Sequence, residues 1–175
     1  MNTNVKKLVL SGMFMAIGLV LPFITGNIPE IGKMLCPMHI PIMLCGIFCG
    51  WQYGLIVGFI TPLLRSVLFG MPVMIPGGVS MAFELATYAL VISLMYHALP
   101  KKPWAIYVSL ITSMLAGRVV WGILRLIIGG VTGNAFTYSA FISGALLTAI
   151  PGIISQLILV PGIVLLCRKQ INQME

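Results

Sequence analysis

HIPIMLCGIFCGWQYGLIVGFITPLLR (His39–Arg65) contains two apolar runs, and a single arginine closes the second run. The runs are joined by Gly50-Trp51-Gln52-Tyr53-Gly54. Long apolar runs with almost no charge are typical of membrane helices, and aromatic rings are enriched where such helices meet water. The segment therefore predicts two helices in a bilayer, over about 38–50 and 52–69, with a tight turn between them.

The same pattern continues through the rest of the chain. Of the 175 residues, 59% are hydrophobic and 7% are charged, whereas a soluble domain carries about 25% charged residues. We therefore expect one all-α integral membrane domain over 1–175, a six-transmembrane-helix bundle. The expected spans are 5–24, 38–50, 52–69, 79–99, 104–128 and 138–166. The first span resembles a signal peptide without a clear cleavage site, and we interpret it as uncleaved.

Basic residues predict the orientation of the spans. If the N-terminus is inside, the cytoplasmic loops and ends carry six basic residues and the outer loops carry only Lys33. The six are Lys6, Lys7, Lys101, Lys102, Arg168 and Lys169. This asymmetry predicts that both termini are cytoplasmic in a prokaryotic plasma membrane. The net charge of +7 then reflects membrane topology, and no nucleic-acid partner is expected.

Four ionisable residues fall inside the expected spans: Arg65, Glu84, Arg118 and Arg125. Such a residue at bilayer depth costs roughly 2.5–3.5 kcal/mol on insertion scales and mostly faces a bundle interior or a wet cavity. In the expected topology all four lie in the outer half of the membrane or near its midplane. This distribution predicts a cup that opens outward and is closed below, rather than a channel through the bilayer.

A polar stripe marks the fifth expected span, because Arg118, Trp121 and Arg125 fall at i, i+3 and i+7 on one helix face. Two cations beside an indole could hold a flat or anionic ligand. Glu84 could contact the ligand or organise the residues that do. Alternatively, Arg118 or Arg125 neutralises Glu84 and ties two spans together. Arg65 lies near the outer surface, so it either lines the cup or extends to the lipid headgroups.

Three further residues are candidates for contact with a ligand. His39 opens the second span, Tyr88 lies one turn below Glu84, and Asn134 lies in the last outer loop. Each also has a simpler interpretation, as a helix cap, a packing aromatic and a turn residue respectively.

The sequence contains no motif for ATP hydrolysis and none for a known hydrolase. GxxxxGK[ST], HExxH and GxSxG do not occur, and there is no aspartate. The four cysteines form no CxxC or Cys/His metal spacing. We therefore expect no catalytic residues, no metal and no cofactor.

The first span carries a ridge of small residues at Gly12 and Ala16, with Gly18 nearby. Small residues four apart let another helix approach closely. The ridge could contact a helix of this chain or a helix of another protein.

Taken together, these features resemble the substrate-binding S components of energy-coupling factor (ECF) vitamin transporters. The matching stretches are His39–Leu64, Gly70–Pro72 and MAFELATYAL (Met81–Leu90). They are similar to the branch that includes pantothenate, folate and pyridoxine or hydroxymethylpyrimidine carriers. The resemblance covers nearly the whole chain.

The resemblance implies that the chain binds a vitamin in an outward pocket and delivers it as part of an ABC-type importer. Its partners would be a transmembrane coupling protein, docked through the ridge of the first span, and two ATPase subunits that hydrolyse ATP. The family ridge is typically AxxxA, and here Gly12 replaces the first alanine.

Three buried arginines against one glutamate favour a carboxylate-bearing ligand such as pantothenate. Folate, vitamin B6, hydroxymethylpyrimidine or a queuosine precursor are the alternatives. Two other classes of protein also remain open, a stand-alone membrane facilitator and an intramembrane enzyme.

Overall fold

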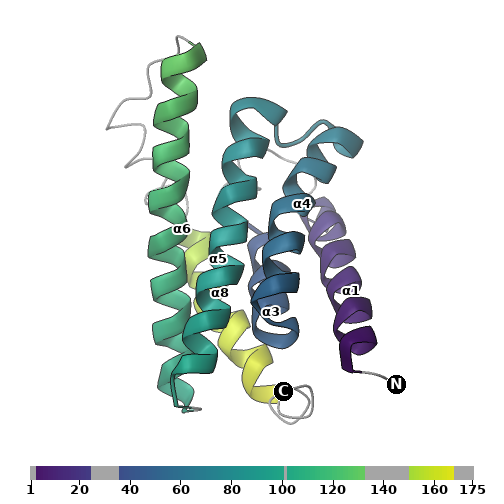
Figure 1. The fold of residues 1–175 in the computed structure, drawn as a ribbon, viewed down its shortest axis with the longest axis vertical. Coiled ribbons are helices and arrows are strands. Elements are labelled where there is room, and N and C mark those ends of the chain that lie inside the picture. The colour runs from purple at the N-terminus through teal and green to yellow at the C-terminus, as the bar shows by residue number, and fades with distance from the viewer. Residues whose placement is uncertain (1–2, 25–35, 101, 133–149, 168–175) are drawn as a thin grey trace.

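The computed structural model describes residues 3–24, 36–100, 102–132 and 150–167, and within these ranges the chain is helical, with no strand (Figure 1). The helices are α1 (Thr3–Ile24), α3 (His39–Cys49), α4 (Trp51–Phe69), a short π-helical segment η1 (Met74–Gly78), α5 (Val79–Ala98), α6 (Pro103–Thr132) and α8 (Ile150–Leu166). The described helices lie within a few residues of the expected spans, except that 138–149 of the last expected span lie outside the described residues.

Four of these helices, including η1 with α5 as one unit, are long and apolar enough to cross a membrane. α3 has 11 residues and α8 has 17 in its described part. At 1.5 Å per residue α3 is about 16 Å long, roughly half the thickness of a bilayer core. The chain is an all-α polytopic membrane protein, as predicted, in which the shortest helix lies inside the bundle.

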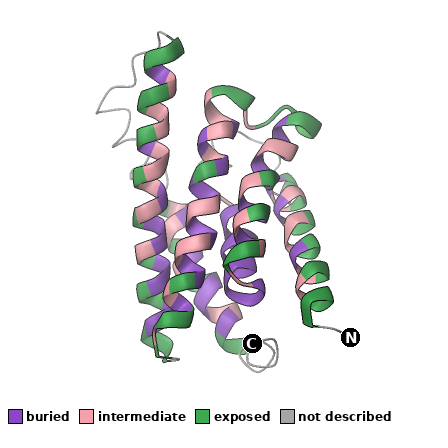
Figure 2. Ribbon diagram, viewed as in Figure 1, coloured by how far each residue is buried: buried purple, intermediate pink, exposed green. Residues whose placement is uncertain are grey.

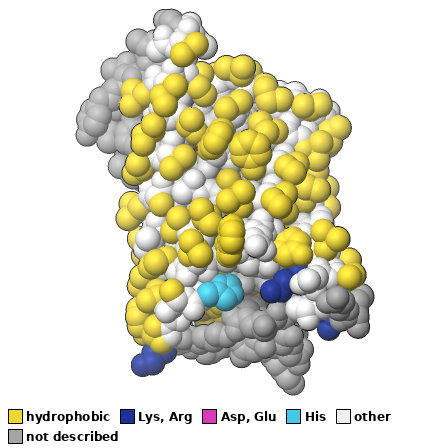
Figure 3. Space-filling view, viewed as in Figure 1, with side chains coloured by type: hydrophobic (Ala, Val, Ile, Leu, Met, Phe, Trp, Pro, Cys, Tyr) yellow, Lys and Arg dark blue, Asp and Glu magenta, His cyan; other side chains and the backbone are white. Residues whose placement is uncertain are grey.

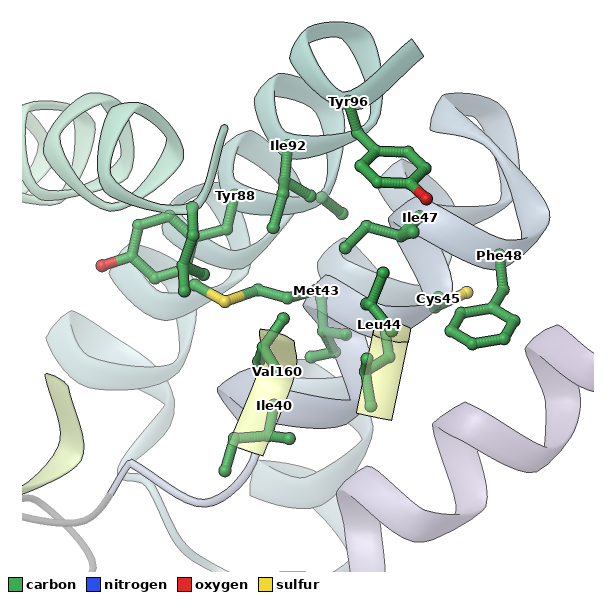
Figure 4. Close-up of a cluster of buried hydrophobic side chains, with 14 of the residues drawn as sticks. Ile40, Met43, Leu44, Cys45, Ile47, Phe48, Tyr88, Ile92, Tyr96 and Val160 are labelled. Atoms are coloured by element: carbon green, nitrogen blue, oxygen red, sulfur yellow. The ribbon is translucent and has the colours of Figure 1, made fainter. Parts of the chain in front are cut away.

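α3 forms the centre of the bundle, and all of its residues are buried. It contacts α1, α4, α5 and α8. Met43 from α3, Tyr88 and Ile92 from α5 and Val160 from α8 gather in one apolar cluster (Figure 4). A helix that is apolar on all sides is expected to be buried in this way.

Glycines bring α3 and α4 against α5. A Cβ added to Gly46 would lie 2.6 Å from the carbonyl oxygen of Ala89, and one added to Gly58 would lie 2.7 Å from that of Leu85. Both neighbours are backbone atoms, which cannot move without moving the helix. The spacing of these three helices therefore depends on the missing side chains.

The outer surface is apolar, as a lipid-facing surface should be. Exposed residues follow the outward faces of α1 and α6, while the purple, buried residues lie between the helices (Figure 2). On the face seen in Figure 3 hydrophobic side chains cover most of the height, and Lys, Arg and His side chains appear only near the end that holds the N-terminus.

Candidate functional site

A buried ion pair joins α5 to α6. Arg118 Nη1 lies 3.0 Å from Glu84 Oε1, and the two side chains are 16% and 2% exposed. The hydroxyl of Tyr88 donates a hydrogen bond of 2.9 Å to the same carboxylate oxygen. Glu84 and Tyr88 are one turn apart on α5, so both face α6. Of the two interpretations of Glu84 drawn from the sequence, the pairing with Arg118 is present in the structure.

Gly117 makes room for this arrangement. A Cβ at Gly117 would overlap the ring of Tyr88. Without a side chain there, the Tyr88 ring packs against Gly117 of α6, and its hydroxyl points away from the apolar cluster (Figure 4). Gly117 thus positions the tyrosine that holds Glu84.

His39 brings the first residue of α3 to the same carboxylate. Its Nε2 is 3.8 Å from Glu84 Oε1, which is too long for a hydrogen bond. Its ring centroid is 5.4 Å from that of Tyr88. His39 is 2% exposed, and neither ring nitrogen has a hydrogen-bond partner among the described residues. Buried polar atoms of this kind cost about 1–3 kcal/mol each unless something satisfies them.

Cys36 lies beside the ion pair, in the segment that leads into α3. It lies close enough to Arg118 to interact with it electrostatically, and its φ of 46° is left-handed, which is uncommon for a residue with a side chain. We refer to Cys36, His39, Glu84, Tyr88 and Arg118 as the Glu84 cluster.

Gln156 on α8 is a polar residue that the sequence analysis missed. It is 2% exposed, and its Oε1 has no hydrogen-bond partner within the described parts of the chain. The same cost that drew attention to the arginines applies to an uncharged amide in an apolar helix. The cost of burying this amide was therefore the signal by which the sequence could have identified Gln156.

Arg65 contacts a different part of the bundle. Its Nη1 donates a 2.8 Å hydrogen bond to the carbonyl of Leu19 on α1. Its guanidinium lies 5.1 Å from the ring centroid of Phe23 and 5.6 Å from that of Phe69. Arg65 thus ties α4 to α1, and these contacts explain its burial without a ligand.

Arg125 and Trp121 form a second pair on α6, with the guanidinium 5.4 Å from the indole centroid. Arg125 is 21 positions beyond Trp104, which corresponds to about 32 Å along a helix, close to the full thickness of a bilayer core. The stripe predicted on this helix therefore divides, with Arg118 in the Glu84 cluster and Arg125 about two turns further along α6 beside Trp121. Asn134, the remaining candidate, lies outside the described residues.

The Glu84 cluster has the chemistry of a binding site rather than of a catalyst. It offers a neutralised ion pair together with ring nitrogens that make no hydrogen bond to any residue the structure describes. Within the described residues, no group of three or more His, Cys, Asp and Glu side chains could hold a metal ion.

A family model described as "ECF transporter, substrate-specific component" matches residues 6–164. The chain belongs to this family of S components. Searches among curated proteins and among solved structures found no match to the chain. The protein is therefore a multi-pass protein of the cell membrane, a transport subunit and not an enzyme, and it works with an ECF module of a transmembrane coupling protein and ATPases.

Proposed function

We propose that this S component captures a small water-soluble vitamin from outside the cell at the Glu84 cluster and delivers it by docking on the ECF module. The observation that carries the proposal is His39. Its two ring nitrogens are buried beside the Arg118–Glu84 pair and make no hydrogen bond within the described part of the chain. In a substrate-specific subunit, such atoms are the ones that a ligand would satisfy.

The proposed orientation places both termini in the cytoplasm. Its support is the basic side chains near the end of the bundle that holds the N-terminus (Figure 3) and the positive-inside tendency of membrane proteins. Glu84 is 14 positions before Ala98, the last residue of α5, or about 21 Å along the helix. With the inner end of α5 at the cytoplasmic surface, the cluster lies in the outer half of the bilayer.

The proposed docking surface is the outward face of α1. Gly12 and Ala16 are both exposed, and a Cβ added to Gly12 would meet no atom within 4 Å. The exposed apolar side chains of Leu8, Val9 and Met13 flank them. This face fits a helix of the coupling protein, whose two ATPase subunits would supply the energy.

The identity of the vitamin stays a prediction. The sequence favoured pantothenate because three arginines face one glutamate. In the structure Arg118 pairs with Glu84 and Arg65 binds a carbonyl, so the arginines favour a carboxylate less strongly. Vitamin B6, hydroxymethylpyrimidine, folate and a queuosine precursor remain candidates beside pantothenate.

The test is a thermal-shift panel of these compounds on the detergent-purified protein, followed by uptake into liposomes with and without the ECF module. One compound should raise the melting temperature of the folded protein, and its uptake should require the module and ATP. Uptake in liposomes that contain this chain alone would instead indicate a facilitator.

A further inference from the structure

The packing of α8 beside α3 brings Gln156 to about the same height in the bundle as His39. It precedes Val160 by one turn on the same face of α8, and Val160 packs in one cluster with Ile40 and Met43 of α3 (Figure 4). α3 and α8 run in the same direction, toward the end of the bundle that holds the N-terminus (Figure 1). One turn back along α8 therefore corresponds to the start of α3, where His39 is.

The buried polar atoms at this height that make no hydrogen bond within the described residues are mainly acceptors. Gln156 Oε1 accepts hydrogen bonds and cannot donate them, and a neutral His39 ring adds one acceptor and one donor. None of these three atoms has a hydrogen-bond partner among the residues that the structure describes. A ligand that satisfies them has to bring hydrogen-bond donors, such as hydroxyl, amino or amide N–H groups.

The charges at this level are already balanced. Arg118 and Glu84 form an ion pair at 3.0 Å. A carboxylate entering the cluster would compete with Glu84 for Arg118 and would meet the acceptors of Gln156 and His39. Desolvating a charge that is left poorly paired is costly.

We propose that Gln156 is a substrate-contacting residue, and that the part of the substrate that enters the cluster is uncharged and rich in hydrogen-bond donors, not a carboxylate. This inference rests on the proposed function and narrows its substrate class. The head of the ligand is a hydroxylated or amino-substituted group that donates to Gln156 Oε1 and exchanges hydrogen bonds with His39.

The first experiment needs no knowledge of the natural ligand. Gln156→Met keeps the volume of the side chain and removes the unsatisfied carbonyl, so the melting temperature of the ligand-free protein should rise by about 2–4 °C. Ser109→Ala is the matched control, because the hydroxyl of Ser109 is buried but bonded to Ala105 in its own helix. A fall in melting temperature for Gln156→Met would mean that the amide supports the fold, and would overturn its assignment.

The second experiment compares two matched pairs of probes by thermal shift, panthenol with pantothenate and pyridoxine with 4-pyridoxate. At least one alcohol should stabilise the protein more than its acid, with about tenfold weaker binding to Gln156→Met and unchanged binding to Ser109→Ala. Greater stabilisation by an acid, or no response to either alcohol, would overturn the proposal.

Capture of the wild-type chain by its ECF module separates the two levels of inference. If the module binds the chain while the alcohols fail, the substrate class is wrong and the proposed function stands. If the module does not bind the chain, the proposed function itself fails.

Discussion

Small residues serve two different purposes in the helices packed around α5 and on the outer face of α1. The backbone of α5 packs directly against Gly46 and Gly58, and the ring of Tyr88 packs against Gly117. A Cβ added to any of these three glycines would therefore clash with α5. On α1, Gly12 faces open space. Packing within the chain explains the first group and leaves Gly12 unexplained. The contrast teaches that a small residue on a membrane helix indicates a partner only where the chain's own neighbours are absent.

The largest effect on stability should come from breaking the ion pair between Glu84 of α5 and Arg118 of α6. Glu84→Ala leaves Arg118 buried without its partner, and we expect a loss of about 3 kcal/mol in the free energy of unfolding, together with loss of ligand-induced stabilisation. Unfolding in a denaturant series measures the first effect and thermal shift the second. The double variant Glu84→Gln/Arg118→Gln should recover much of the stability. An unchanged single variant would show that the pair does not hold α5 to α6.

The packing of α4 on α5 should give the next largest effect. Gly58→Val places methyl groups against the backbone of Leu85, so α5 has to shift, at a cost of about 2 kcal/mol. Gly130→Val is the matched control, because no described atom lies within 4 Å of a Cβ at Gly130. Equal melting temperatures for the two variants would show that glycines packed against α5 are no more important for stability than glycines without a neighbouring helix.

A smaller loss is expected at Gly117. Gly117→Ala pushes the Tyr88 ring away from α6 and weakens its hydrogen bond to Glu84, with a cost of about 1 kcal/mol and a weaker response to ligand. Tyr88→Phe removes only the hydroxyl and should reproduce most of the loss in ligand response. If Gly117→Ala responds to ligand like the wild type, Gly117 does not position the site.

The sequence predicted the helices well and the site only in part. Long apolar runs determine where helices lie in a bilayer, so 79–99 was close to the observed Val79–Ala98. The Glu84–Arg118 pair was one of two alternatives, because helix depth brings both residues to one level but does not give the direction of a side chain.

Two other residues could not be placed in the same way. Arg65 was indistinguishable from a pocket residue until its contact with the carbonyl of Leu19 was seen. Gln156 lies in an apolar run, and its only polar neighbour there is the adjacent Ser155, which points to a different face of the helix. No polar residue stands three or four positions from Gln156 to mark a polar face. Its importance depends on a neighbouring helix that the sequence does not identify.

The smallest effect on stability should be at Gly12. Gly12→Trp adds a large ring to the open face of α1, and we expect the melting temperature to stay within about 1–2 °C of the wild type, as for other surface changes. Gly18→Trp is the contrasting variant on the same helix, because a Cβ at Gly18 would lie 3.3 Å from the methyl of Thr61. Gly18→Trp should be clearly destabilised.

The most direct test of the account is uptake of the identified ligand into liposomes that contain the ECF module and the Gly12→Trp chain. The account predicts wild-type ligand binding and melting temperature together with loss of ATP-dependent uptake, because the open face of α1 is reserved for the coupling protein. Uptake at the wild-type rate would contradict the assignment of this face as the docking surface, since Gly12 would then contact only lipid.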